Sequence, residues 1–243
     1  MVKLFLTLSL WFSSSYAQEK VLTLGVPFQI KRVGAIVEYQ KLVSNALKDA
    51  GFETQTKVTA GKVPYEEMLA GKIDGILYDD LHIKKGRKHT ISTSFPLIKT
   101  KSRIFYLKEN PRFKNHDFSD TGLAKYKGSI SSANKSIEAE ALRRNLSFIN
   151  SNNPLHNVTA LLEGKVDYFI AIEEVGKSAV IAHPGAKDKI SSSDTVFTEV
   201  PLYLTFHKKH GKEMAKIEQI LIKHLRGDLR QYPQISESLN KDP

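Results

Sequence analysis

Two acidic residues occupy matching places in a short repeated sequence. A Gly-Lys-x-Asp segment ending at Asp74 recurs as a second segment ending at Asp167, and each copy precedes an apolar run. Asp80 lies six residues after the first aspartate, and Glu173 lies six residues after the second. If the intervening strands end at a shared cleft, the two acids approach one ligand and require a cation or an amine there. We interpret Asp74 and Asp167 themselves as structural turn residues.

Four further residues are candidates for the same pocket. Phe28 follows the first expected strand and Tyr78 ends a later one, so each is expected either on the apolar side of the pocket or in the core. Asn134 and Ser136 belong to a turn that leads into a helix. The free amides at a helix start are able to hold an anion, while the alternative is that Ser136 simply caps the helix.

The sequence contains no motif for catalysis or for a cofactor. The eight histidines show no paired metal-ligand spacing, and His207 and His210 lie in a basic turn. A nucleophile elbow, a phosphate-binding loop and a dinucleotide fingerprint are all missing from the sequence. There is no cysteine to form a disulfide or a thiolate site. We therefore predict no catalytic residue, no metal and no cofactor.

Strands and helices alternate along the chain. Such alternation favours parallel strands joined by crossover helices, so the expected fold class is α/β. Glycines at 51, 71 and 164 and prolines at 64 and 154 mark helix ends and starts. The expected elements are strands at 21–26, 54–59, 73–78, 128–132 and 166–171 and helices at 33–47, 64–70, from 136, 154–163 and 214–225, with a loop at 110–117.

Two extended segments are expected to cross between two lobes. They cover residues 103–107 and 196–206, and Pro201 in the second favours an edge or crossing position. These crossings divide the chain into a first lobe at 18–105, a second lobe at 106–195 and a return to the first lobe at 196–243. Each lobe is then a mixed, mostly parallel sheet flanked by helices.

Composition and the first residues indicate an exported protein. The 243 residues are 41% hydrophobic, which is enough for one large or two small cores. Residues 1–17 carry Lys3, an apolar run and a small residue at Ala17, which is typical of a cleavable signal peptide; a membrane anchor is the alternative. Without cysteine there is no lipid acceptor, so we predict a periplasmic location. The net charge is +10, but the lysines are scattered, so nucleic acid is not an expected partner.

The order of these segments resembles the family 3 extracellular solute-binding proteins, the amino-acid-binding type with the type II periplasmic-binding fold. The resemblance implies a monomer that holds a small polar solute between two lobes by hinge closure and delivers it to a membrane permease of the ABC type. It also implies that Arg87 grips an α-carboxylate and Glu173 accepts an α-ammonium, each one residue later than in a typical member. Alternatively, Arg87 is solvated in its basic loop and Glu173 lies on the surface beside Glu174.

The sequence departs from this family after the first repeat. Tyr78, Asp79 and Asp80 stand where amino-acid binders tend to present small hydroxyls and glycines, which predicts a different pocket. Two other functions stay open. One is a ligand sensor without a transport role, and the other is an enzyme similar to exported cyclohexadienyl dehydratases, with Glu173 as an acid or base.

Overall fold

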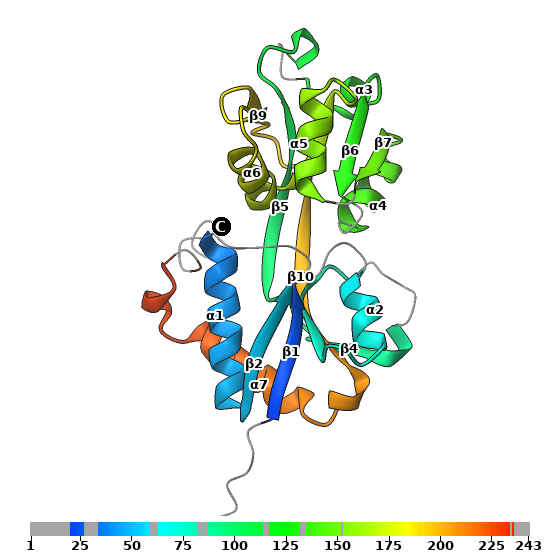
Figure 1. The fold of residues 1–243 in the computed structure, drawn as a ribbon. Helices are drawn as coiled ribbons and strands as arrows, with labels where there is room; N and C mark the ends of the chain where they lie inside the picture. The colour runs from blue at the N-terminus through cyan, green and yellow to red at the C-terminus, as the bar shows by residue number, and fades with distance from the viewer. Residues whose placement is uncertain are drawn as a thin grey trace, which may run out of the picture.

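Two α/β lobes are joined by two long strands (Figure 1). The structure is a computed structural model. It describes residues 20–26, 34–58, 63–81, 87–113, 117–131, 135–151, 153–233 and 235. The predicted signal peptide, Phe28 and Asn134 lie outside these residues, and so does the side chain of Arg87. No helix within these ranges is long and apolar enough to cross a membrane.

The first lobe is built on a sheet with the strand order β2-β1-β3-β10. The first three strands are parallel and β10 is antiparallel to β3. Helix α7 returns from the second lobe and contacts α1. The elements of the first lobe are β1 (Lys20–Val26), α1 (Gly34–Asp49), β2 (Phe52–Val58), α2 (Val63–Leu69), β3 (Gly75–Asp79), η1 (Arg87–His89), β4 (Thr90–Ser92), η3 (Lys208–His210), α7 (Met214–Arg226) and η4 (Leu229–Gln231).

The second lobe continues the sheet in the order β5-β8-β6-β7. Strands β6, β7 and β8 are parallel, whereas β5 is antiparallel to β8. Its elements are η2 (Pro111–Phe113), α3 (Asp120–Leu123), β6 (Lys127–Ser131), α4 (Lys135–Arg143), β7 (Ser147–Ser151), α5 (Pro154–Leu162), β8 (Tyr168–Ile172), α6 (Glu173–Ala182) and β9 (Ile190–Ser192).

Strands β5 (Ile98–Leu107) and β10 (Thr198–His207) belong to both lobes. They pair antiparallel, with Thr198 opposite Ser102 and Leu202 opposite Ile98. Beyond this shared stretch β5 pairs with β8 in the second lobe and β10 pairs with β3 in the first. Pro201 lies inside the shared stretch, opposite Lys99. The two lobes are thus linked through a two-stranded antiparallel ribbon.

The repeated segment has the same backbone in both copies. Gly71 follows α2 with φ of 71°, and Gly164 follows α5 with φ of 68°. Their N–H groups donate to the carbonyls of Met68 and Leu161, three residues earlier. This left-handed conformation ends a helix at little cost only when the residue is glycine. The sequence repeat is therefore also a repeat of structure.

The two turn aspartates make equivalent bonds to a neighbouring strand. Asp74 Oδ2 accepts the N–H of Thr23 at 3.0 Å, and the N–H of Asp74 donates to the Thr23 carbonyl at 2.7 Å. Asp167 makes the same pair of bonds with Lys127, at 2.9 Å and 2.8 Å. In each lobe the aspartate thereby fixes the start of a core strand against its parallel neighbour.

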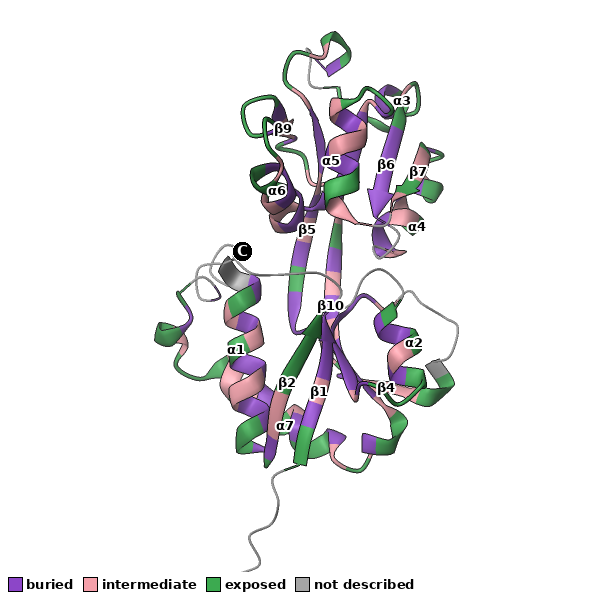
Figure 2. Ribbon diagram, in the orientation of Figure 1, coloured by how far each residue is buried: buried purple, intermediate pink, exposed green. Residues whose placement is uncertain are grey.

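Burial follows the expected pattern of a covered sheet (Figure 2). Strands β3 and β8 are buried along their whole length, whereas the outer strand β2 becomes exposed toward its end. In the second lobe Phe105 of β5 and Phe169 of β8 stack with ring centroids 4.7 Å apart, under α5 and α6. Direct stacking of aromatic side chains on neighbouring strands stabilises the pairing of those strands.

Several elements differ from the sequence prediction. Helix α6 and strand β7 were not predicted, and η2 lies within the predicted loop at 110–117. Helix α6 follows β8 without a break, and its N-cap residue Ile172 makes no side-chain capping bond. The capping signal was therefore missing from the sequence, although Glu173 and Glu174 place acidic residues in the first turn. By contrast, α5 begins at Pro154 as predicted, and Asn153 caps it with a side chain that accepts the N–H of His156 at 3.0 Å.

Candidate functional site

The two lobes meet through Asp80 and Ser136. Asp80 follows the last residue of β3, and Ser136 lies in the first turn of α4. The Ser136 N–H donates to Oδ2 of Asp80 at 3.0 Å, and both residues are buried. The first N–H groups of a helix have no partner inside the helix and carry partial positive charge. The structure therefore brings together two of the predicted site residues, and a carboxylate of the first lobe serves a helix of the second.

Ser136 does not cap α4 with its side chain. The helix begins one residue earlier, at Lys135, and Lys135 Nζ forms an ion pair with Glu138 one turn later. Ser136 Oγ is buried and has no hydrogen-bond partner among the described residues. Its contribution to the start of the helix is the backbone N–H that Asp80 accepts.

Asp79 fixes the turn that carries Asp80. Its Oδ1 accepts the N–H of Leu81 at 3.1 Å, and its Oδ2 accepts the hydroxyl of Thr205 at 2.8 Å. Leu81 has φ of 57°, a left-handed conformation that is unusual for leucine. Thr205 also shares a 2.7 Å hydrogen bond with Ser92 of β4. The turn after β3 is thus tied to β10, one of the two connecting strands.

Tyr78 lies in the core of the first lobe. It is 4% exposed, and its hydroxyl donates to the carbonyl of Ile36 in α1 at 2.6 Å. Burial, together with nearby Tyr39, raises the pKa of the Tyr78 phenol well above its usual range. The phenol is therefore neutral and holds β3 against α1, which matches the core alternative for this residue more closely than the pocket role.

Glu173 has partners from its own lobe. It begins α6, and its carboxylate accepts hydrogen bonds from Arg103 Nε and from Lys177 Nζ, the latter at 2.5 Å. Burial alone raises the pKa of Glu173, but the bonds from Lys177 and Arg103 outweigh it and lower the pKa below its ordinary value. Glu173 is therefore ionised near neutral pH, and each of its oxygens already accepts a hydrogen bond.

Arg103 is a residue that the sequence reasoning placed only in a strand. It projects from β5, and besides Glu173 its guanidinium binds the carbonyls of Ser193, at 3.1 Å, and Asp194. A single arginine at the start of the apolar run Ile104 to Leu107 was the available signal. Arg103 connects β5, α6 and the segment that leads into β10.

Glu174 is the other carboxyl at the start of α6. Burial raises its pKa, and the negative charge of Glu173 adds to this effect. Its Oε2 is buried and without a hydrogen-bond partner in the described part of the chain. The two adjacent acids therefore differ, with the pKa of Glu173 lowered and that of Glu174 raised.

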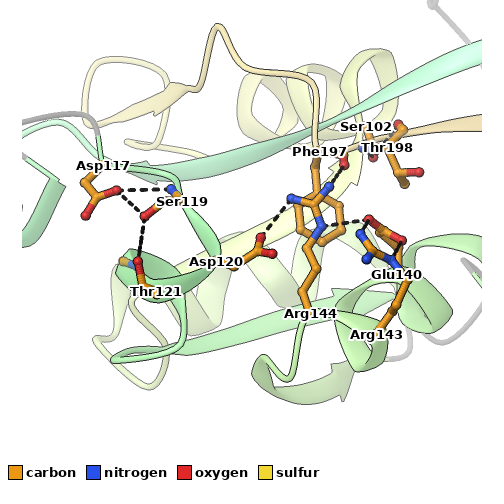
Figure 3. Close-up of polar contacts among 11 residues, drawn as sticks. Ser102, Asp117, Ser119, Asp120, Thr121, Glu140, Arg143, Arg144, Phe197 and Thr198 are labelled. Atoms are coloured by element: carbon orange, nitrogen blue, oxygen red, sulfur yellow. Dashed lines mark hydrogen bonds and ion pairs between the residues drawn. The ribbon is translucent and has the colours of Figure 1, made fainter.

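Arg144 attaches the end of α4 to the base of β10 (Figure 3). Its guanidinium lies over the ring of Phe197 at 4.4 Å and donates to the Phe197 carbonyl at 2.6 Å. It also contacts Glu140 at 2.7 Å and Asp120 at 3.2 Å. Helix α4 thus contacts the first lobe at its start and the connecting ribbon at its end.

Comparison with known proteins finds similarity in the fold. No protein-family profile and no curated protein matches the sequence. Among solved structures, the substrate binding protein of an amino acid ABC transporter is 12% identical with a TM-score of 0.66, over 91% of this chain and 98% of that one. An arginine transport system periplasmic binding protein from Legionella pneumophila is 12% identical with a TM-score of 0.68, over 91% and 99%.

A third similar structure has a different role. It is a histidine kinase sensor domain with similarity to periplasmic binding proteins, 13% identical with a TM-score of 0.69, over 92% of this chain and 96% of that one. The predicted fold class is confirmed, because the chain has the two-lobed α/β fold of periplasmic binding proteins along nearly its whole described length.

Proposed function

We propose that this protein is a periplasmic solute-binding protein for an ABC-type uptake system. It captures a small polar solute, an amino acid or an amine-bearing metabolite, between its lobes by hinge closure. The observation that carries this proposal is the Asp80–Ser136 contact between two lobes that are otherwise joined by the β5–β10 ribbon. Closure around a ligand requires such opposed surfaces on a flexible connection. The similarity to amino acid and arginine binding proteins supports the same role.

The proposed solute site lies where the cleft-facing ends of both lobes meet. Asp80 and Ser136 mark that place, and in the second lobe Glu173 begins α6 and is bonded to Arg103 of β5. The proposed lobe boundaries stay at 18–105, 106–195 and 196–243, with β5 and β10 containing both crossings. The proposed ligand-binding residues are Phe28, Asp80, Arg87, Asn134, Ser136 and Glu173, whereas Tyr78, which the sequence also nominated, is proposed to support the end of β3 from the core.

A thermal-shift screen tests the proposed function. Amino acids, polyamines and small organic acids are screened with the mature chain, and calorimetry follows on the first compound that raises the midpoint. Arg87→Ala and Glu173→Ala are then compared with the parent on that compound. Asp228→Ala is the control, because Asp228 is exposed and, among the described residues, its carboxylate bonds within the Asp228–Arg230 turn. Wild-type affinity in both Arg87→Ala and Glu173→Ala would contradict the site assignment.

A sensor role is the second candidate, and the similar histidine kinase sensor domain favours it. A transport protein is expected beside genes for a permease and an ATPase, whereas a sensor is expected beside a histidine kinase or a cyclase. Co-purification of the solute-loaded protein with a permease from the same membrane supports transport. Cell fractionation tests the proposed periplasmic location, because an exported chain is expected in the periplasmic fraction with residues 1–17 removed. The elution volume of this chain in size-exclusion chromatography tests the proposed monomer.

An enzymatic role on this fold is less well supported. A general acid near neutral pH needs a raised pKa, whereas Arg103 and Lys177 lower the pKa of Glu173. Incubation with prephenate or arogenate checks the dehydratase alternative, because turnover would release an aromatic product. We expect no turnover above a control without protein, and product formation that Glu173→Gln abolishes would replace binding with catalysis as the proposed function.

A further inference from the structure

The start of α4 already binds an anionic group of the protein itself, the carboxylate of Asp80. A helix N-terminus attracts negatively charged groups because its first N–H groups are unpaired within the helix. In α4 one of these N–H groups, that of Ser136, donates to the Asp80 carboxylate. The helix has nine residues, and the contact is buried from solvent, with Asp80 8% and Ser136 7% exposed.

A second observation at the same place indicates a polar binding position. Ser136 Oγ is a buried hydroxyl without a partner among the described residues. Buried hydroxyls nearly always have a partner, so the unpaired hydroxyl of Ser136 indicates a position where a further polar group is expected to bind. The carboxylate of Asp80 and this hydroxyl are presented together at the junction of the lobes.

The backbone around Asp80 holds the carboxylate in this position. The side chain of Asp79 accepts hydrogen bonds from Leu81 and Thr205, so Asp80, which lies between Asp79 and Leu81 in the sequence, is held in a fixed turn. At the other end of α4, Arg144 fixes the helix to the segment before β10. The turn on one side and the anchored helix on the other place the negative Asp80 carboxylate against the partial positive charge at the start of α4 when the lobes close.

We propose that Asp80 is a specificity-determining residue, which fills the anion position of α4 and so excludes solutes that carry a carboxylate there. This rests on the proposed solute-binding function and narrows the solute to an amine without a carboxylate. A solute carboxylate would be repelled by the carboxylate of Asp80, and the N–H of Ser136 that could bind it already donates to Asp80. An amine meets an attractive charge instead, and the lobes close without any anion from the solute.

Acetate tests this assignment without knowledge of the solute. Asp80→Gly removes the side chain and leaves space for one acetate ion, and Asp80→Asn keeps the size of the side chain but removes its charge. The radius of gyration from X-ray scattering and the thermal midpoint are measured without solute in sodium chloride and in sodium acetate of equal ionic strength. Asp228→Gly is the control for loss of an aspartate outside the junction.

The proposed role of the Asp80 charge leads to a distinct expectation for each variant. Wild type and Asp228→Gly keep one radius in both salts. Asp80→Gly has a larger radius in chloride, and acetate returns the radius toward the wild-type value in a saturable manner and raises the midpoint. Asp80→Asn is expected between these limits, and circular dichroism verifies that each variant is folded.

Two results would overturn the assignment. One is an Asp80→Gly radius equal to that of wild type in chloride, with Asp80→Asn equal as well. The other is an expanded variant that responds to acetate no more than to chloride. Either result with a confirmed amine or amino acid ligand leaves the solute-binding function in place and removes only the role of Asp80. Acetate rescue in a protein that binds no solute keeps the role of Asp80 and removes the proposed function.

Discussion

The carboxylate of Asp80 accepts the backbone N–H of Ser136 at 3.0 Å and thereby joins the end of β3 to the first turn of α4. A hydrogen bond to a charged group contributes about 1.5–3 kcal/mol when it is shielded from water. Because this bond links two lobes, its free energy acts on the balance between open and closed arrangements. Its loss is expected to shift that balance by roughly 10- to 100-fold.

Matched pairs of solutes provide the first prediction. Cadaverine differs from lysine, and agmatine from arginine, by the absence of a carboxylate. We expect the amines to bind at least about tenfold more tightly than the amino acids, since a like charge beside Asp80 is costly. Calorimetry with each pair measures the ratio. In Asp80→Gly the ratio is expected to fall, and an amino acid that outcompetes its amine in the wild type would contradict the prediction.

Glu140 predicts a dependence of stability on pH. A hydrogen bond from Arg143, opposed by partial burial and assisted by one from Arg144, lowers the pKa of Glu140 from 4.5 to about 2. A depressed pKa in the folded state stabilises the protein above the unfolded value, and this contribution is lost as the pH falls from about 4.5 to about 2. Glu140→Gln is therefore expected to be less stable at pH 7 by about 1 kcal/mol.

Urea unfolding at pH 7 and pH 2.5 checks this prediction. The difference between wild type and Glu140→Gln is expected to shrink at the lower pH, because Glu140 of the unfolded wild type is then protonated, and proton uptake on unfolding removes most of the stabilisation that the lowered pKa gives the folded state. Glu163→Gln is the matched control, since within the described ranges the exposed Glu163 carboxylate forms an ion pair with Lys165 at 2.6 Å. A difference that is constant between the two pH values would contradict the assigned pKa.

Gly71 and Gly164 predict equal effects in the two lobes. Both have positive φ, and a Cβ added to either would meet no atom within 4 Å. Alanine at either site therefore introduces backbone strain alone, about 1 kcal/mol. Chemical denaturation measures the loss, and asparagine, which tolerates this conformation better, is expected to lose less. Opposite or very unequal effects would indicate that the two turns differ in solution.

Asn157 predicts a stabilising substitution. The residue is fully buried in α5, and neither atom of its side-chain amide has a hydrogen-bond partner in the described part of the chain. Because an unpaired buried amide is costly, Asn157→Leu is expected to raise the free energy of unfolding by about 1–2 kcal/mol. Asn157→Asp is the opposite control and is expected to destabilise. Destabilisation by leucine would contradict the prediction.

Much of the architecture could be predicted from local signals. The glycines after α2 and α5, the Asn153 cap and the alternation of apolar strands with helices each have a local physical cause, and the structure has these elements. Helix α6 was missed because it follows β8 directly and no polar side chain caps it. Its first residue, Glu173, belongs to a network with Arg103, 70 positions away, which no spacing rule reveals.

The site was harder to predict than the fold. Repeat spacing selected Asp80, and helix-start chemistry selected Ser136, but nothing local indicated that the two would bind each other. That contact depends on how the lobes are placed, and 56 positions of sequence separate its partners. Tyr78 ends an apolar strand equally well in a pocket or in a core, and the choice depends on the position of α1 and the Ile36 carbonyl.

The antiparallel pairing of β5 with β10 restricts how the two halves move. A one-residue slip along this ribbon would turn every side chain of the sliding strand to the opposite face, so sliding is forbidden while twisting and bending are cheap. We therefore expect any movement of the halves to twist or bend this ribbon and not to shear one half past the other. A closure of this kind would bring Asp80 back to the N–H of Ser136 each time, because the strand register fixes where each lobe lies along the ribbon.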